Sequence, residues 1–215
     1  MNTKLVAATV VALLASAGVA QAADFKPKAK GEIILDVRLT EVAPQGTDPI
    51  TTLAGANTGL RADASYDVMP TIGVQYFLTD NIAIEAIAGT TQHTVKAKAP
   101  GVNLKLQELW VIPPVVTLQY HFAPTAKISP YVGAGINYML FYSEKDYNGF
   151  GLKVKDGFGT ALQAGVDFAT GGPWQVNVDV KKVFFDTTAT DRFNKVKSHV
   201  TLDPWVVSAG VGYRF

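Results

Sequence analysis

Apolar and polar residues alternate with a period of two along most of this chain. In residues 31–42 the intervening positions carry both signs of charge, and the apolar face is aliphatic: Ile33, Leu35, Val37 and Leu39. Alternation of this kind predicts a β-strand with one apolar face. The pattern recurs and predicts strands at residues 31–42, 66–78, 81–90, 107–122, 129–142, 157–168, 174–184 and 205–215.

The connections between these strands are alternately long and short. The long ones are rich in glycine, proline or charge, and together they cover residues 43–65, 91–106, 143–156 and 185–203; the short ones cover residues 79–81, 123–128 and 171–173. Outer-membrane barrels show this asymmetry, with long loops outside the cell and tight turns in the periplasm. A soluble β-sandwich, the alternative, has no reason to sort its loops by length. We therefore expect an all-β protein, an eight-stranded antiparallel transmembrane β-barrel over residues 23–215 with four long external loops and three short periplasmic turns.

The last strand carries the pattern of a bilayer-spanning wall. One face is small and polar, and the other is apolar with aromatic residues at both ends: Trp205, Val207, Ala209, Val211, Tyr213 and Phe215. Such a strand suits a barrel whose outer face meets lipid, although the last strand of a soluble sandwich alternates in the same way. The ending on Phe215 resembles the C-terminal strand of bacterial outer-membrane barrels. That resemblance implies that Tyr213 and Phe215 form the signal read by the barrel-assembly machinery.

Residues 1–22 have the features of a secretory signal peptide. Lys4 precedes an uncharged apolar run at residues 5–20, and Ala20-Gln21-Ala22 supplies a small-x-small cleavage motif. An uncleaved anchor is the alternative. Without Lys4 the chain carries 18 basic and 18 acidic side chains, which gives no basic excess for binding nucleic acid. The chain has no cysteine, so an exported fold has to be held by a core or a closed sheet, after a short polar tail at residues 23–30.

The predicted inner face of the barrel is apolar in its outer half. The apolar residues expected there are Met69, Val111, Val115, Met139 and Phe141. A water-filled porin has a polar interior, so these residues favour an apolar solute, or else they fill the barrel. Glycines on the same face keep a narrow interior from overfilling: Gly73, Gly89, Gly133, Gly135, Gly159, Gly165, Gly210 and Gly212.

Nearer the periplasmic end the predicted inner face is charged. The residues there include Asp36, Arg38, Glu85, Asp167, Asp179 and Arg214, with Gln119, Gln175 and Asn177 between them. An unpaired charge is costly in a narrow lumen, so we expect these side chains to form a plug of ion pairs and hydrogen bonds. A plug would block a straight path to the periplasm.

Pro113 and Pro114 interrupt an otherwise regular predicted strand. Proline donates no hydrogen bond to a neighbouring strand, so two in a row should part the wall locally. The pair therefore predicts either a lateral opening or a bulge that merely bends the wall.

Little in the sequence points to catalysis. Asp186, Asp191, His199 and Asp203 share one predicted loop, where an enzyme of the barrel-rim type could gather them, but exposed loop charges are usually solvated. His93, His121 and His199 lack the spacing of metal ligands, with His121 expected inside the barrel near a turn. We expect no enzyme activity, no cofactor and no metal site.

Several stretches resemble the OmpW family of small outer-membrane proteins, which includes the alkane-uptake protein AlkL. They recur in order along residues 23–215: Leu78-Thr-Asp-Asn-Ile-Ala-Ile-Glu85, Pro113-Pro114, Pro130-Tyr-Val-Gly-Ala-Gly-Ile-Asn-Tyr138, Gln163-Ala-Gly-Val-Asp167, Leu202-Asp-Pro-Trp205 and Gly212-Tyr-Arg-Phe215. The connection at residues 43–65 has no clear match. The resemblance implies a narrow barrel in outer-membrane lipid that passes small hydrophobic solutes and releases them sideways. External loops of such a barrel are also candidates for a phage or bacteriocin receptor, and a structural barrel or adhesin with a closed lumen is the alternative function.

Overall fold

A computed structural model of the chain describes residues 25–52, 54–147, 149, 151–191 and 196–215. The predicted signal peptide at residues 1–22 lies outside the described residues. In the part of the chain that is described, no helix is long and apolar enough to span a membrane.

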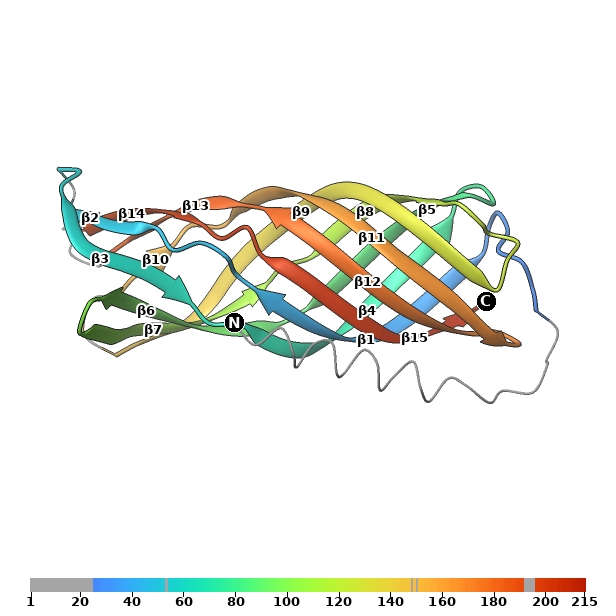
Figure 1. Cartoon of the computed structure of the whole chain (residues 1–215), viewed down its shortest axis with the longest axis horizontal. Coiled ribbons are helices and arrows are strands. Elements are labelled where there is room, and N and C mark those ends of the chain that lie inside the picture. Colours follow the sequence, from blue (N-terminus) through green and yellow to red (C-terminus); the bar gives the residue numbers. More distant parts are fainter. Residues whose placement is uncertain (1–24, 53, 148, 150, 192–195) are drawn as a thin grey trace.

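Eight of the described strands close into an antiparallel barrel, which confirms the predicted fold class (Figure 1). The ladder closes where the last strand pairs with the first, for example at Val37 and Val211. In order around the barrel the strands are β1 (Ile33–Ala43), β4 (Asp67–Phe77), β5 (Ile82–Gly89), β8 (Val115–His121), β9 (Ile128–Asp146), β11 (Gly157–Gly171), β12 (Trp174–Phe184) and β15 (Trp205–Arg214). A closed sheet pairs the backbone groups of every strand, as a hydrocarbon environment requires.

The outer face of the barrel is apolar and the inner face is polar. Val37 is 54% exposed, whereas Arg38, the next residue, is 1% exposed and lies inside. Aromatic side chains gather at the end where Phe215 lies: Tyr213 packs edge-on against Trp174 and Phe215, with ring centroids 5.0 and 4.8 Å apart. This is the pattern of a lipid-facing wall with an aromatic girdle. The assembly role of Tyr213 and Phe215 stays a prediction.

The predicted long loops are wrong in one respect, because much of their length is strand. They contain β2 (Pro49–Thr52), β3 (Asn57–Ala64), β6 (Thr91–Ala99), β7 (Val102–Ile112), β10 (Lys153–Val154), β13 (Asp186–Thr190) and β14 (Val196–Thr201). With the far part of β9 these strands continue the same sheet beyond the barrel, and we call this part the extension. Figure 1 shows the extension at the end opposite the C-terminus.

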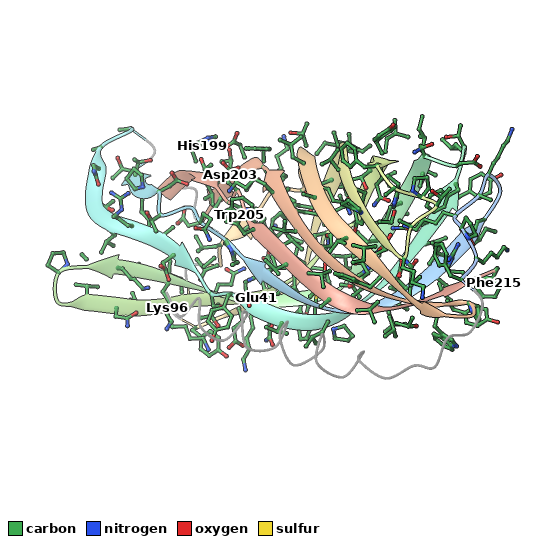
Figure 2. All side chains as sticks on the ribbon, turned by 45° about the vertical axis from the view of Figure 1, so that its right-hand side comes forward. Glu41, Lys96, His199, Asp203, Trp205 and Phe215 are labelled. Carbon is green, nitrogen blue, oxygen red and sulfur yellow. The ribbon has the colours of Figure 1, made fainter. Side chains whose placement is uncertain are left out.

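The glycine and proline signals that suggested loops mark the tips of hairpins instead. Gly55 and Gly101 lie at the turns of the β2–β3 and β6–β7 hairpins with positive φ angles of 84° and 76°, which glycine adopts without strain. The residues between the tips pair as strands, so the extension is a sheet that runs from β10 round to β9, and among the described residues no ladder joins those two strands. Figure 2 shows Lys96 and His199 on the extension and Phe215 at the other end of the molecule.

Two inward glycines allow close contacts inside the barrel. A Cβ atom on Gly135 would collide with the carbonyl oxygen of Val116 on the neighbouring strand, and one on Gly165 would collide with the ring of Tyr131. Tyr131 is 1% exposed and crosses the lumen over Gly165. The glycines therefore leave room for a large side chain as well as for the approach of neighbouring strands.

Candidate functional site

An apolar cavity of about 190 Å³ lies inside the extension and the adjoining part of the barrel. β3, β6 and β7 supply much of its wall, with Leu60, Ala97 and Leu106 among the lining residues. The cavity is apolar because most inward positions of the extension strands carry apolar residues, as in a protein core.

Below the cavity an apolar cluster crosses the barrel. Ile87, Val111, Val115, Met139, Ala161, Val183 and Phe185 are buried together, and Phe141 packs against them. Four of the five residues predicted for an apolar lumen lie here, since Val111, Met139 and Phe141 line the cavity and Val115 belongs to the cluster. Met69 is 6% exposed but lies apart from both groups, beside Gly89.

The barrel wall is interrupted at Pro113 and Pro114. The predicted strand at 107–122 is split there into β7 and β8. β8 pairs with β5 as far as Val115, which lies opposite Ile87, and β7 pairs with β6 from Val111, which lies opposite Thr91. Between these two flanking pairs lie residues 88–90 on one side and residues 112–114 on the other. The two segments are equally long, so neither strand carries the extra residue of a bulge. The result is a local break in the ladder.

On the other side of the prolines the wall is continuous. The amide of Tyr138 and the side-chain nitrogen of Asn137 on β9 both donate to the carbonyl oxygen of Pro114, each at 3.1 Å. The break therefore faces only the segment at residues 88–90, between β5 and β6. The Thr90 and Tyr142 hydroxyls, 2.5 Å apart, form a hydrogen bond from this segment to β9, and β7 lies between β6 and β9 in the sheet.

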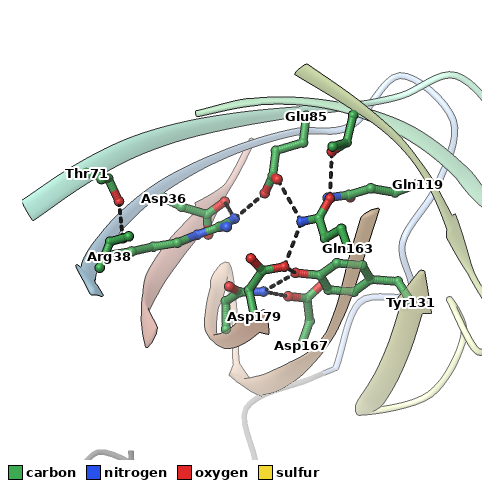
Figure 3. Close-up of polar contacts among 12 residues, drawn as sticks. Asp36, Arg38, Thr71, Glu85, Gln119, Tyr131, Gln163, Asp167 and Asp179 are labelled. Carbon is green, nitrogen blue, oxygen red and sulfur yellow. Dashed lines mark hydrogen bonds and ion pairs between the residues drawn. The ribbon is translucent and has the colours of Figure 1, made fainter. Parts of the chain in front are cut away.

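The lumen beyond the apolar cluster holds an ion-pair network. Arg38 donates to Asp36 at 2.9 Å and to Glu85 at 2.6 Å, and Lys181 approaches Glu85 at 3.1 Å and Asp179 at 2.5 Å. All five residues are almost completely buried. The structure thus places four predicted plug residues in one network, joined by Lys181, as Figure 3 shows in part.

Neutral side chains connect this network to Asp167, the fourth predicted carboxylate. Gln163 donates to Glu85 at 2.8 Å and to Asp179 at 2.7 Å. Tyr131 donates its hydroxyl to Asp179 at 3.0 Å, while the Asn177 amide donates to that hydroxyl at 2.9 Å and to Asp167 at 2.6 Å. Figure 3 shows these side chains meeting across the barrel from β5, β9, β11 and β12.

The segment before β1 enters the open end of the barrel. Lys28 is 5% exposed, forms an ion pair with Asp167, and lies 3.0 Å from Nδ1 of His121. Arg214 donates through Nε and Nη2 to both carboxylate oxygens of Glu32 at 3.0 Å, and therefore lies outside the central network into which it was predicted. The short polar tail predicted at residues 23–30 is therefore held inside the barrel at Lys28, because Lys28 supplies the charge that Asp167 needs.

His93 joins strands at the wall of the cavity. Its Nδ1 lies 2.6 Å from the carbonyl oxygen of Ser65, and its Nε2 lies 3.0 Å from the hydroxyl of Thr91. Asp67 accepts from the Thr91 hydroxyl at 3.1 Å and from the Gln92 amide at 2.7 Å. Burial lowers the pKa of His93 below its usual value of 6.5, and Ser65 and Asp67 oppose the shift.

The residues weighed for a catalytic rim do not converge. Asp186 and His199 form an exposed pair 3.6 Å apart. Asp191 lines the cavity. The Asp203 carboxylate accepts a hydrogen bond from the backbone amide of Phe185 at 2.9 Å. Within the described ranges, no group of three or more histidine, aspartate or glutamate residues could hold a metal ion.

Several important lumen residues were not singled out from the sequence. Tyr131, Gln163 and Lys181 occupy inward positions by strand alternation, so parity along the strand was the signal that could have found them. Lys28 has no such signal, because it precedes the first strand.

The comparisons with known proteins agree with this geometry. The model of the OmpW family matches residues 29–215. The outer-membrane protein y4mB of Sinorhizobium fredii is 39% identical over 182 residues, which cover 81% of this chain and 79% of that protein. The dibenzothiophene metabolism operon protein PahQ of Pseudomonas aeruginosa is 30% identical over 162 residues, covering 73% of this chain and 76% of that protein.

A solved structure supports the same assignment. The crystal structure of the outer-membrane protein OprG from Pseudomonas aeruginosa superposes with a TM-score of 0.83 at 27% identity, covering 89% of this chain and 99% of that one. The closed barrel, its apolar outer face and the match over most of the chain all agree. This chain is an outer-membrane β-barrel and belongs to the OmpW family.

Proposed function

We propose that the protein is a passive outer-membrane channel for small hydrophobic molecules, which enter the cavity of the extension and leave sideways into the lipid at Pro113 and Pro114. In this proposal the extension faces the outside of the cell and the short turns face the periplasm. Outer-membrane barrels place their longer connections outside, which supports that orientation.

The contents of the lumen favour a sideways exit over an axial one. The cavity and the cluster below it are apolar, so they suit a molecule without charge. Beyond them the route down the barrel meets the buried network of Arg38, Glu85 and Lys181. Passing this network would require an apolar solute to separate paired charges in a space that excludes water, which is costly.

The observation that carries the proposal is the position of Pro113. This residue lines the cavity and lies at the break in the ladder between β5–β6 and β7–β8. Irregular backbone at membrane depth is tolerated where it borders a cavity. A solute in the cavity is therefore next to the stretch of wall that has lost its interstrand hydrogen bonds.

The relatives supply independent support. The names of PahQ and DoxH place both in the metabolism operon of dibenzothiophene. Dibenzothiophene is a flat, uncharged aromatic molecule with little hydrogen-bonding capacity. A barrel of this family with an apolar cavity suits the uptake of compounds of that class.

The first test compares uptake of a small apolar compound by cells that lack the protein and by cells that carry it. A third strain carries Pro113→Ala with Pro114→Ala, and a fourth carries Pro130→Ala, a proline of β9 on the exposed face. We expect the wild type and Pro130→Ala to speed uptake. The double variant should be slower, because the restored amide of residue 113 can pair with the segment at residues 88–90, while the amide of residue 114 faces β9.

The alternative functions predict different outcomes. If wild type and double variant speed uptake equally, the channel stands and the exit lies elsewhere in the wall. If neither speeds uptake, the proposal fails, and a structural or receptor role of the extension becomes the better account. A role as phage or bacteriocin receptor stays a prediction.

A further inference from the structure

Seven polar residues line the otherwise apolar cavity, and six of them are engaged by the protein itself. Asp48 accepts the Thr201 amide at 2.5 Å, Asp63 pairs with Lys98 at 2.7 Å, and Thr58 donates to the Ile50 carbonyl at 2.7 Å. Thr91 and His93 belong to the wall network described above, and Asp191 also has a partner. The seventh is Gln107.

Gln107 is an unusual residue for its place. It lies on β7 and is 1% exposed, with Val95 directly opposite on β6 and Leu109 next on the same face. Among the described residues, neither its side-chain nitrogen nor its oxygen has a partner in hydrogen-bonding geometry. A buried amide without partners destabilises a fold, so its presence on an apolar wall needs a reason.

A nearby carboxylate sets the orientation of this amide. Glu144 on β9 lies near the Gln107 side chain and is stabilised in its charged form by it, although no hydrogen bond of normal geometry joins the two. A carboxylate attracts the NH₂ group and repels the carbonyl oxygen. We infer that Nε2 of Gln107 turns toward Glu144, which leaves Oε1 as an acceptor for the cavity that Gln107 lines.

Bound water does not account for Gln107 as well as it does for other unpaired atoms. The remaining unpaired polar atoms of the lumen, such as those of Gln75 and Arg38, lie among charged and amide side chains. A water there finds the two to four polar partners that it needs. The neighbours of Gln107 on the cavity wall, Val95 and Leu109, have no polar side-chain group, so a water there would depend on Glu144 for a second side-chain partner.

We propose that Gln107 selects solutes that are apolar except for one hydrogen-bond donor, such as an alkylphenol or an aliphatic alcohol. The hydroxyl donates to Oε1 of Gln107 while the hydrocarbon part fills the apolar cavity. A cavity of about 190 Å³ is somewhat larger than one known to bind benzene, so a substituted single ring fits. This inference rests on the proposed function, since it assumes that the cavity is where solutes bind.

The test uses two compounds of nearly equal shape. p-Cresol carries a hydroxyl where p-xylene carries a methyl group, and binding of each to the full-length protein in lipid nanodiscs is measured by calorimetry against empty nanodiscs. The wild type is compared with Gln107→Met, which keeps the length of the side chain but has no amide. Gln92→Met is the matched control, because Gln92 lies on the adjacent strand and does not line the cavity.

We expect Gln107→Met to weaken p-cresol binding about fivefold, the effect of one neutral hydrogen bond, and to leave p-xylene binding unchanged. Gln92→Met should bind both compounds as the wild type does. If wild type and Gln107→Met bind p-cresol equally while both bind p-xylene, the inference is overturned and the proposed function stands. If the wild type binds neither compound, both are overturned.

Discussion

The charged side chains in the lumen have almost no contact with water. Arg38 is 1% exposed and Glu85 0%, and an isolated charge in such a place is strongly destabilising. Each is tolerated here because a partner of opposite sign lies within hydrogen-bonding distance. Removing one member of a buried ion pair therefore lowers the stability of the fold more than replacing both members with apolar residues does.

Lys28 provides a test of this reasoning at a single residue. Lys28→Met leaves the buried carboxylate of Asp167 without its cation, although Asn177 still donates to it. We expect the free energy of unfolding in lipid vesicles, measured by urea titration, to fall by about 3 kcal/mol. Lys30→Met, at an exposed side chain two residues away, should change it little. Equal stability of the two variants would show that Lys28 is not an integral part of the lumen.

Strand parity explains which of these residues could be predicted. Asp36, Arg38 and Glu85 lie on strands whose alternation is regular, so their inward direction followed from the sequence. Which of them would touch depended on the stagger between strands, and the sequence does not specify this. Lys28 lies before the first strand and could not be placed by periodicity.

At the scale of the elements, the wall continues beyond the barrel where loops were expected. Short alternating stretches such as Leu104-Lys105-Leu106 and glycine-marked tips such as Gly101 look like loop in a single sequence. They become strand because each hairpin pairs with the next and because their inward side chains enclose a shared cavity. That gain appears only when all the hairpins are together, so local patterns do not reveal it.

His93 on β6 contacts Ser65, which lies between β3 and β4, and we call this contact region the seam. We predict that the stability of the seam depends on pH. His93 bridges this seam, and its pKa in the folded chain lies below 6.5 because burial disfavours the charged ring. Below pH 6.5 the unfolded chain therefore binds more protons than the folded one. The stability that neutral His93 contributes is complete above that pH and is lost as the pH falls toward the folded pKa.

We accordingly expect added protease to cleave the extension of the purified protein in lipid faster at pH 5 than at pH 7.5. His93→Gln, which cannot become charged, should reduce the difference between the two pH values. His121→Gln, the same change inside the barrel, should not reduce it. An unchanged difference in His93→Gln would mean that another group governs the seam.

At the scale of the whole molecule, the proposed function assigns a part to the wall, the cavity and the plug. An apolar outer face holds the barrel in lipid, and a polar plug fills its lower lumen. Beyond the plug lies a cavity whose wall is interrupted where Pro113 stands. The resemblance in sequence pointed to this arrangement, but the position of the break relative to the cavity required the register of the strands.

A covalent lock across the break tests the central claim most directly. The chain has no cysteine, so Thr90→Cys with Ile112→Cys introduces a single pair, at positions that face each other in register across the unpaired segment. Ala86→Cys with Val116→Cys is the control, because that pair lies within the intact ladder. The measurement is the rate at which cells carrying each protein take up a small apolar compound, before and after reduction of the disulfide.

We predict that the oxidised lock slows uptake to the rate of cells without the protein and that reduction restores it. The control pair should transport equally well in both states. The reduced form of the lock also shows what loss of the Thr90–Tyr142 hydrogen bond does by itself. Undiminished uptake through the oxidised lock, with the disulfide shown to have formed, would contradict sideways release at the proline pair.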